Sequence, residues 1–164
     1  MAFASTLVVQ KTVALLTGDG GLTATVPEIA LMSGLTLPEI APQQIAAQNV
    51  SAEIAGESGS VRYPVFHVYC EKLTNSQKER FRVFSGEVGI VVEARVSQDR
   101  LAGLEEQLHG CVDAVTQSLE ENLGDWEDGV FYAGGYDVTY SQVKRGGRNY
   151  LQSAKVSFTV AVSR

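Results

Sequence analysis

The sequence predicts an α+β fold, in which an antiparallel β-sheet of about four strands carries helices packed on one face. Apolar and polar residues alternate from Tyr150 to the end of the chain, which is typical of a strand with one buried face. Shorter alternations surround Phe66 and Val92, and apolar residues recur at helical spacing from Leu101 to Leu119. The helical stripe needs an apolar surface to cover, and the strands supply one.

Composition indicates a single domain. The chain has 164 residues and 45% hydrophobic content, enough for one sizeable core. No apolar run is long enough to span a bilayer, and the N-terminus lacks the features of a secretory signal, so we expect an intracellular protein without a membrane partner. The two cysteines, Cys70 and Cys111, lie far apart and are expected in the core.

The N-terminal part is expected to begin with a helix over about residues 5–16, which ends at the glycines of residues 18–21. No cation lies between Lys11 and Arg62. The first 61 residues therefore carry one Lys against five acidic residues, a net charge of −4, and the remainder carries −2 of the total of −6. A net negative chain disfavours broad nucleic-acid binding, which needs clustered cations.

Residues 18–61 are rich in Ala, Gln, Gly and Ser and are predicted to form a loop or arm. Pro-Glu-Ile-Ala occurs at residues 27–30 and again at 38–41, and Pro followed by Glu suits the first turn of a short helix. The unit is too short for a solenoid repeat. We expect this arm to become ordered against a neighbouring subunit, with four candidate contact residues: Pro27, Ile29, Pro38 and Ile40.

Residues 62–164 are predicted to form the core in the order strand, strand, helix, strand, strand. The first strand has Phe66, Val68 and Cys70 on one face, and the second begins near Phe81 and runs to about Val96. Ser97 is the expected N-cap of the long helix, which continues to Leu123 and stops at Gly124.

The last two strands are predicted to form a hairpin. Residues 136–143 pair with the strand that starts at Tyr150, and Gly146 and Gly147 supply the turn between them. The connecting loop concentrates three cations: Lys144, Arg145 and Arg148.

This ending resembles the C-terminal hairpin of tail terminator (tail completion) proteins of long-tailed bacteriophages. The similarity lies in residues 129–132, 135–138 and 146–158, and a weaker match extends back to about Arg62. It does not cover residues 18–61. The motifs are structural, and no chemistry is attached to them.

The resemblance implies a virion protein of the tail or neck, assembled in the host cytoplasm. In that family the subunits form a hexameric ring, which caps the tail tube and joins it to the head-side neck. The expected partners are therefore other copies of the chain, the tail tube protein and the neck protein, with DNA passing through the lumen without sequence-specific binding.

The sequence shows little sign of catalytic or metal chemistry. His67 and Cys70 are three apart on a strand, and His109 and Cys111 are two apart on a helix, so neither pair converges on a metal. An exposed His67 and a buried Cys70 are expected instead. Residues 18–21 lack the Lys-Ser/Thr of a phosphate-binding loop. We expect no enzyme activity and no cofactor.

Two features are candidate interaction sites. The basic loop is either a solvated turn or a tip that docks on an acidic neighbour or touches passing DNA. Trp126, the only Trp, lies in an acidic turn and either caps the core or anchors an interface.

Two other functions remain open from the sequence. One is another head–tail connector or minor tail protein. The other is an enzyme or a small-ligand-binding α+β domain, which would use the sheet face opposite the helices.

Overall fold

The computed structural model describes residues 3–52 and 61–164 and shows an α+β fold. Its helices are α1 (Ala4–Thr17), α2 (Leu22–Ser33), the short 3-10 helix η1 (Pro42–Gln44) and α4 (Leu104–Glu120). Its strands are β1 (Ile45–Ala47), β2 (Val65–Asn75), β3 (Ser85–Gln98), β4 (Gly124–Asp125), β5 (Val130–Tyr132), β6 (Asp137–Tyr140), β7 (Lys144–Gly146) and β8 (Asn149–Ser163).

The three long strands β2, β3 and β8 are antiparallel and form the centre of the sheet. Along its other side, β8 pairs in turn with β7, β6 and β5. Strand β1 joins β2 in parallel, so the sheet is mixed and eight-stranded, and the expectation of about four antiparallel strands is wrong in detail. The additional strands β1, β4, β5 and β7 have two or three residues each, too few for an alternating pattern to indicate them.

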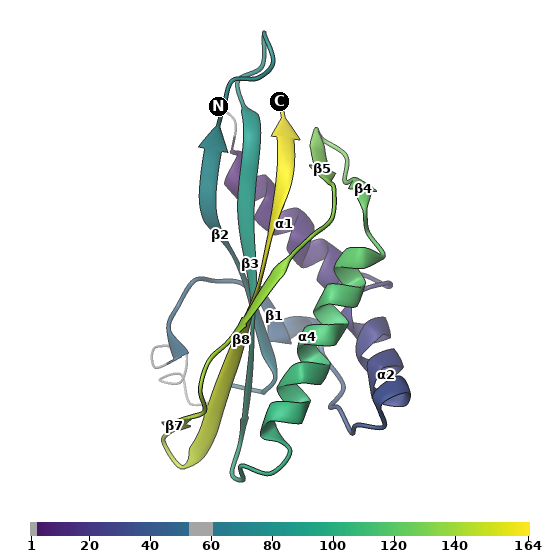
Figure 1. Ribbon diagram of the computed structural model, residues 1–164, viewed down its shortest axis with the longest axis vertical. Coiled ribbons are helices and arrows are strands. Elements are labelled where there is room, and N and C mark those ends of the chain that lie inside the picture. The colour runs from purple at the N-terminus through teal and green to yellow at the C-terminus, as the bar shows by residue number, and fades with distance from the viewer. Residues whose placement is uncertain (1–2, 53–60) are drawn as a thin grey trace.

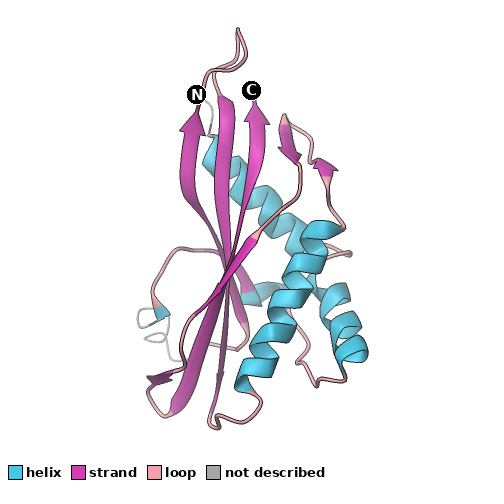
Figure 2. Cartoon of the chain, in the orientation of Figure 1, coloured by secondary structure: helices cyan, strands magenta, loops and turns pink. Residues whose placement is uncertain are grey.

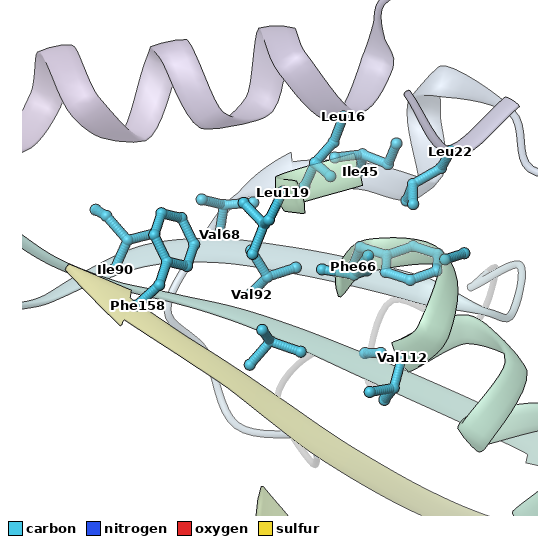
Figure 3. Close-up of a cluster of buried hydrophobic side chains, with 14 of the residues drawn as sticks. Leu16, Leu22, Ile45, Phe66, Val68, Ile90, Val92, Val112, Leu119 and Phe158 are labelled. Carbon is cyan, nitrogen blue, oxygen red and sulfur yellow. The ribbon is translucent and has the colours of Figure 1, made fainter. Parts of the chain in front are cut away.

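The helices α1, α2 and α4 lie on one side of the sheet (Figures 1 and 2). The predicted alternation is confirmed on this side, because the even-numbered residues of β3 and β8 that face the helices are buried: Val88, Ile90, Val92, Ala94, Val96, Ala154, Val156, Phe158, Val160 and Val162. Figure 3 shows Leu119 and Val112 of α4 among these side chains, beside Phe66 and Val68 of β2.

The predicted arm is part of this core. Leu22 and Val26 of α2 are buried, as are Ile40 and Ile45, and Leu22 and Ile45 lie beside Leu16 of α1 in Figure 3. Helix α2 also packs on α4 through a contact of 3.2 Å between the hydroxyls of Thr25 and Ser118. The few apolar residues of the segment fall where α1, α4 and the sheet leave a surface to cover. Residues 53–60 of the predicted arm lie outside the described residues.

The repeated tetrapeptide does not begin helices as expected. Pro27 lies inside α2, whereas Pro38 lies in a stretch without regular secondary structure. The two copies therefore have different conformations, which agrees with a chance similarity.

The long helix starts later than predicted. Ser97 belongs to β3, and its hydroxyl donates a hydrogen bond of 2.8 Å to the carbonyl of Tyr150. Gly103, at φ 81°, precedes the first residue of α4, so Leu101 lies in a turn and is 57% exposed. The helix ends at Glu120, and Gly124 begins β4.

Candidate functional site

The face of the sheet opposite the helices, here called the open face, carries a row of charged residues. His67 of β2 lies directly across from Glu93 of β3, and Glu93 lies directly across from Lys155 of β8. Side chains opposite each other on neighbouring strands are close enough to interact. The distance between the ammonium nitrogen of Lys155 and Oε1 of Glu93 is 3.9 Å.

Glu93 and Arg95 form a buried ion pair in this row. Arg95 Nε donates to Glu93 Oε2 at 2.5 Å, and Arg95 Nη2 donates to the backbone carbonyl of Val50. The two residues are only 7% and 4% exposed. Arg95 Nη1 is buried and has no hydrogen-bond partner within the described residues. The chain at Val50 therefore covers part of the open face and holds the Arg95 side chain beneath it.

His67 and Tyr69 complete the cluster. Burial lowers the pKa of His67, and the neighbouring Arg95 guanidinium lowers it further. Burial also raises the pKa of Tyr69 to about 12, with Glu93 contributing, and the Tyr69 hydroxyl donates to Glu93 Oε1 at 3.3 Å. Both side chains are thus neutral near pH 7. The expected exposure of His67 is wrong, since His67 is buried. Cys70 packs against the core as expected, but it is only partly buried.

A groove of about 1020 Å³ lies over this cluster. One wall is formed by residues 49–52 with Val61 and Tyr63, and the other by the hairpin of β7 and β8. The floor is formed by strands β2, β3 and β8, and includes Tyr69, Glu93 and Ser153. Among the described residues, four cations line the groove against the single carboxylate of Glu93: Arg95, Lys144, Arg145 and Lys155. This described lining is therefore cationic in an acidic protein.

The adjoining part of the open face has the opposite charge. A second hollow of about 830 Å³ is lined by Glu71, Glu87 and Asp137 against the single cation Lys72. Small residues, among them Gly89 and Ser157, form its floor. The sign of the charge thus changes along the sheet.

The sheet has a free edge on each side within the part of the chain that the structure describes. Strand β1 pairs with residues 66–68 of β2 only, which leaves residues 69–75 without a second partner. On the other side, β6 pairs with β8 and has no further neighbour. Free edges offer backbone groups to another strand.

The tip of the hairpin between β2 and β3 exposes apolar side chains. Leu73 is 50% exposed, Val83 is 61% exposed, and Phe81 is fully exposed with a positive φ of 65°. Figure 1 shows this tip projecting beyond the C-terminal end of β8. Exposed apolar groups on a projecting hairpin are typical of a contact with another protein.

The predicted basic loop is a hairpin with a tight turn. Lys144 and Arg145 belong to β7, and Arg148 follows Gly147 in the turn. The guanidinium carbon of Arg145 lies 5.0 Å from the ring centre of Tyr150. Lys144 and Arg145 line the groove, whereas Arg148 does not.

Trp126 packs at the edge of the core. Its ring lies 5.6 Å from Tyr132 and 6.2 Å from Phe158, and its Nε1 donates to the carbonyl of Asn122 at 2.7 Å. Lys11 of α1 fastens the same turn, since its ammonium group donates to the Trp126 carbonyl and pairs with Asp128 at 2.9 Å.

The four candidate contact residues of the predicted arm differ in exposure. Pro27 is exposed, Ile29 and Pro38 are partly buried, and Ile40 is buried in the core. The structure thus separates them, and it does not bring any of them to the groove.

Sequence reasoning did not identify Glu93 and Arg95 as site residues. A signal was present, since two charged residues interrupt the apolar second strand two positions apart. Alternation places them on the face away from the helices, where charged residues are usually solvated. Their burial depends on the loop at Val50, which is distant in sequence.

Residues 3–52 and 61–164 contain no group of three or more His, Cys, Asp or Glu side chains placed to hold a metal ion. Burial raises the pKa of Cys111 to about 12, so this thiol is no nucleophile at neutral pH. None of the described helices has the length and apolarity needed to cross a membrane. Comparison with protein-family models finds no match, and comparison with curated proteins finds none either.

Proposed function

We propose that this chain is a non-enzymatic structural protein of a bacteriophage virion, most similar to a tail terminator, and that it acts as a closed ring of like subunits. The observation that carries the proposal is the pair of free sheet edges on opposite sides of one subunit, residues 69–75 of β2 and Asp137–Tyr140 of β6.

The directions of the two edge strands support a ring. Strand β2 is antiparallel to β3, β3 is antiparallel to β8, and β8 is antiparallel to β6. Strand β2 therefore runs opposite to β6. A rotation about an axis along the strands keeps these directions, so β2 of one copy meets β6 of the next as an antiparallel pair. Repeated contacts between two different surfaces close into a ring when the rotation closes.

The projecting hairpin supports contact with a further partner. Its tip carries Phe81 and Val83 beyond the paired ends of β2 and β3, while the turn between β7 and β8 lies at the other end of the molecule (Figure 1). A ring that joins a tail tube to a neck needs a contact surface at each end. The resemblance to tail terminators favours six subunits and passage of DNA through the lumen.

A single charged residue on one edge tests the proposal. Leu73→Lys places a cation on the free edge of β2, and charge on an edge strand opposes pairing with another strand. Leu101→Lys is the matched control, because Leu101 is similarly exposed but lies in the turn before α4. Multi-angle light scattering over a concentration series, with negative-stain microscopy, measures the assembly.

The expected result is a closed ring for the parent and for Leu101→Lys, and a folded monomer for Leu73→Lys. A parent that stays monomeric at every concentration, with and without tail tubes, contradicts the ring. A ring that persists in Leu73→Lys contradicts the role of the edges.

A further inference from the structure

We propose that the cationic groove over Glu93 and Arg95 binds an acidic peptide segment of a partner protein, with a carboxylate of that segment placed between Lys144, Lys155 and Arg95. The groove reaches the free edge of β2 at Tyr69, but Lys144, Lys155 and Arg95 lie outside both free edge segments. The inference therefore holds whether or not the subunits form a ring.

At the floor of the groove, the guanidinium of Arg95 has one nitrogen that, within the described part of the chain, is free to donate a hydrogen bond. Glu93 and the Val50 carbonyl accept from two nitrogens of Arg95, and Nη1 lacks an acceptor within the described residues. A buried donor without a partner is costly, and an acceptor that reaches it removes this cost. Carboxylates suit this donor because hydrogen bonds between charged groups are among the strongest in proteins.

Two lysines stand nearer to solvent than Arg95. Lys155 is directly across from Glu93, with a side chain that is 52% exposed, and Lys144 of β7 lies directly across from Leu151 on the same face. Within the described lining, Glu93 is the one carboxylate, and it does not neutralise the three cations. An arriving carboxylate would therefore meet the exposed lysines first.

The size and the lining favour a peptide over a free inorganic anion. About 1020 Å³ is at the upper end of the usual range for ligand sites and far exceeds one phosphate ion. Apolar surface from Val50, Tyr63 and Leu151 lies beside the cations. A peptide offers both carboxylates and apolar stems to such a lining.

The charge of the adjoining surface disfavours a nucleic acid. Glu71, Glu87 and Asp137 lie farther along the same face, and the whole chain carries −6. A long polyanion laid along the sheet would meet these carboxylates and be repelled. A short acidic segment fits the cationic part alone.

Fluorescence anisotropy with a labelled peptide of alternating Gly and Glu tests the proposal at low salt. The matching Gly-Gln peptide controls for charge, and a labelled short oligothymidylate and inorganic phosphate as competitor represent the other anions. The expected result is binding of the Gly-Glu peptide only. In nitrogen-resolved NMR spectra, the same peptide should shift the Nε–H signal of Arg95.

The variant Lys144→Gln with Lys155→Gln removes the two exposed cations and leaves the buried pair intact. We expect the affinity for the Gly-Glu peptide to fall about 5- to 20-fold, as two weak charge pairs predict. Lys78→Gln is the control, since Lys78 is an exposed cation of the distant hairpin tip.

Three outcomes would overturn the proposal. One is an equal loss of affinity in Lys78→Gln, which would indicate attraction by overall charge. Another is tighter binding of the oligothymidylate or full displacement by phosphate. The third is a parent protein that leaves the Gly-Glu peptide unbound and the Arg95 signal unmoved.

Discussion

Arg95 and Glu93 place two charges inside a protein whose described residues otherwise bury mostly apolar side chains. Ion pairs of this kind are costly to desolvate, and apolar replacements are often as stable. A contribution to stability is therefore a weak explanation for the presence of the Glu93–Arg95 pair. The open groove above the pair offers a better reason, because a positioned guanidinium recognises an anion.

The free energy of unfolding is expected to depend on Leu108 of α4. Leu108 is fully buried under the sheet, so Leu108→Ala should lower the free energy of unfolding by about 2–5 kcal/mol. Leu101→Ala is the control and should change it by less than about 0.5 kcal/mol, since Leu101 is exposed. Urea titration measures both values. Equal effects would mean that the buried face of α4 is assigned wrongly.

The buried thiol of Cys111 is expected to make the free energy of unfolding fall as the pH rises above 9. Burial raises its folded pKa from 9.0 to about 12, so the unfolded thiol ionises first. The stabilisation is complete below pH 9 and is lost as pH rises from 9 towards 12. Between pH 8 and 10 the parent should lose about 1 kcal/mol more than Cys111→Ala. Urea titrations at the two pH values measure this, and identical losses would contradict a buried, protonated thiol.

At the scale of elements, the pairing of β2 with β3 depends on a glycine. A Cβ added at Gly86 would lie 1.8 Å from the carbonyl oxygen of Thr74, whereas one at Gly89 would lie at an ordinary 3.5 Å from Lys72. The first contact is with backbone, so a side chain at Gly86 must push the two strands apart.

Substitution by alanine at these two glycines tests the pairing. Gly86→Ala should lower the free energy of unfolding by about 1–3 kcal/mol, as forced overpacking does. Gly89→Ala serves as the matched control in the same strand and should change it little. Thermal and urea unfolding measure both. If Gly86→Ala is as stable as the parent, β2 and β3 can move apart near Thr74 at no cost, and the pairing does not depend on this glycine.

At the scale of the whole molecule, residues 22–47 and the sheet share one core. Ile40 is 3% exposed and belongs to the same buried cluster as Phe158 of β8. A segment that shares its core with the sheet cannot unfold separately at no cost. We therefore expect one cooperative unfolding transition.

Ile40→Ala tests whether residues 22–47 unfold together with the sheet. The substitution should lower the free energy of unfolding by about 2–5 kcal/mol when unfolding is followed by the fluorescence of Trp126, which lies far away in sequence. Leu31→Ala, in the same segment but 87% exposed, should leave the transition in place. If Ile40→Ala leaves the unfolding transition of Trp126 unchanged, residues 22–47 unfold independently of the sheet.

The sequence alone determined the local elements. Alternation at residues 150–162 indicates which side of β8 faces the core, and helical spacing at Leu104, Leu108 and Leu119 indicates the buried face of α4. These patterns are readable because each depends on residues within one element. The hairpin of residues 136–164 was readable for the same reason, since its strands are close in sequence.

Only the tertiary structure decided the rest. Leu22 and Ile40 are too sparse to form a periodic stripe, and their burial depends on surfaces offered by α1, α4 and the sheet. Glu93 and Arg95 indicate a solvated face when considered alone, and the Val50 carbonyl that helps to bury them is 45 residues away from Arg95. Short-range patterns record which face is apolar. They do not record which distant segment covers the other face.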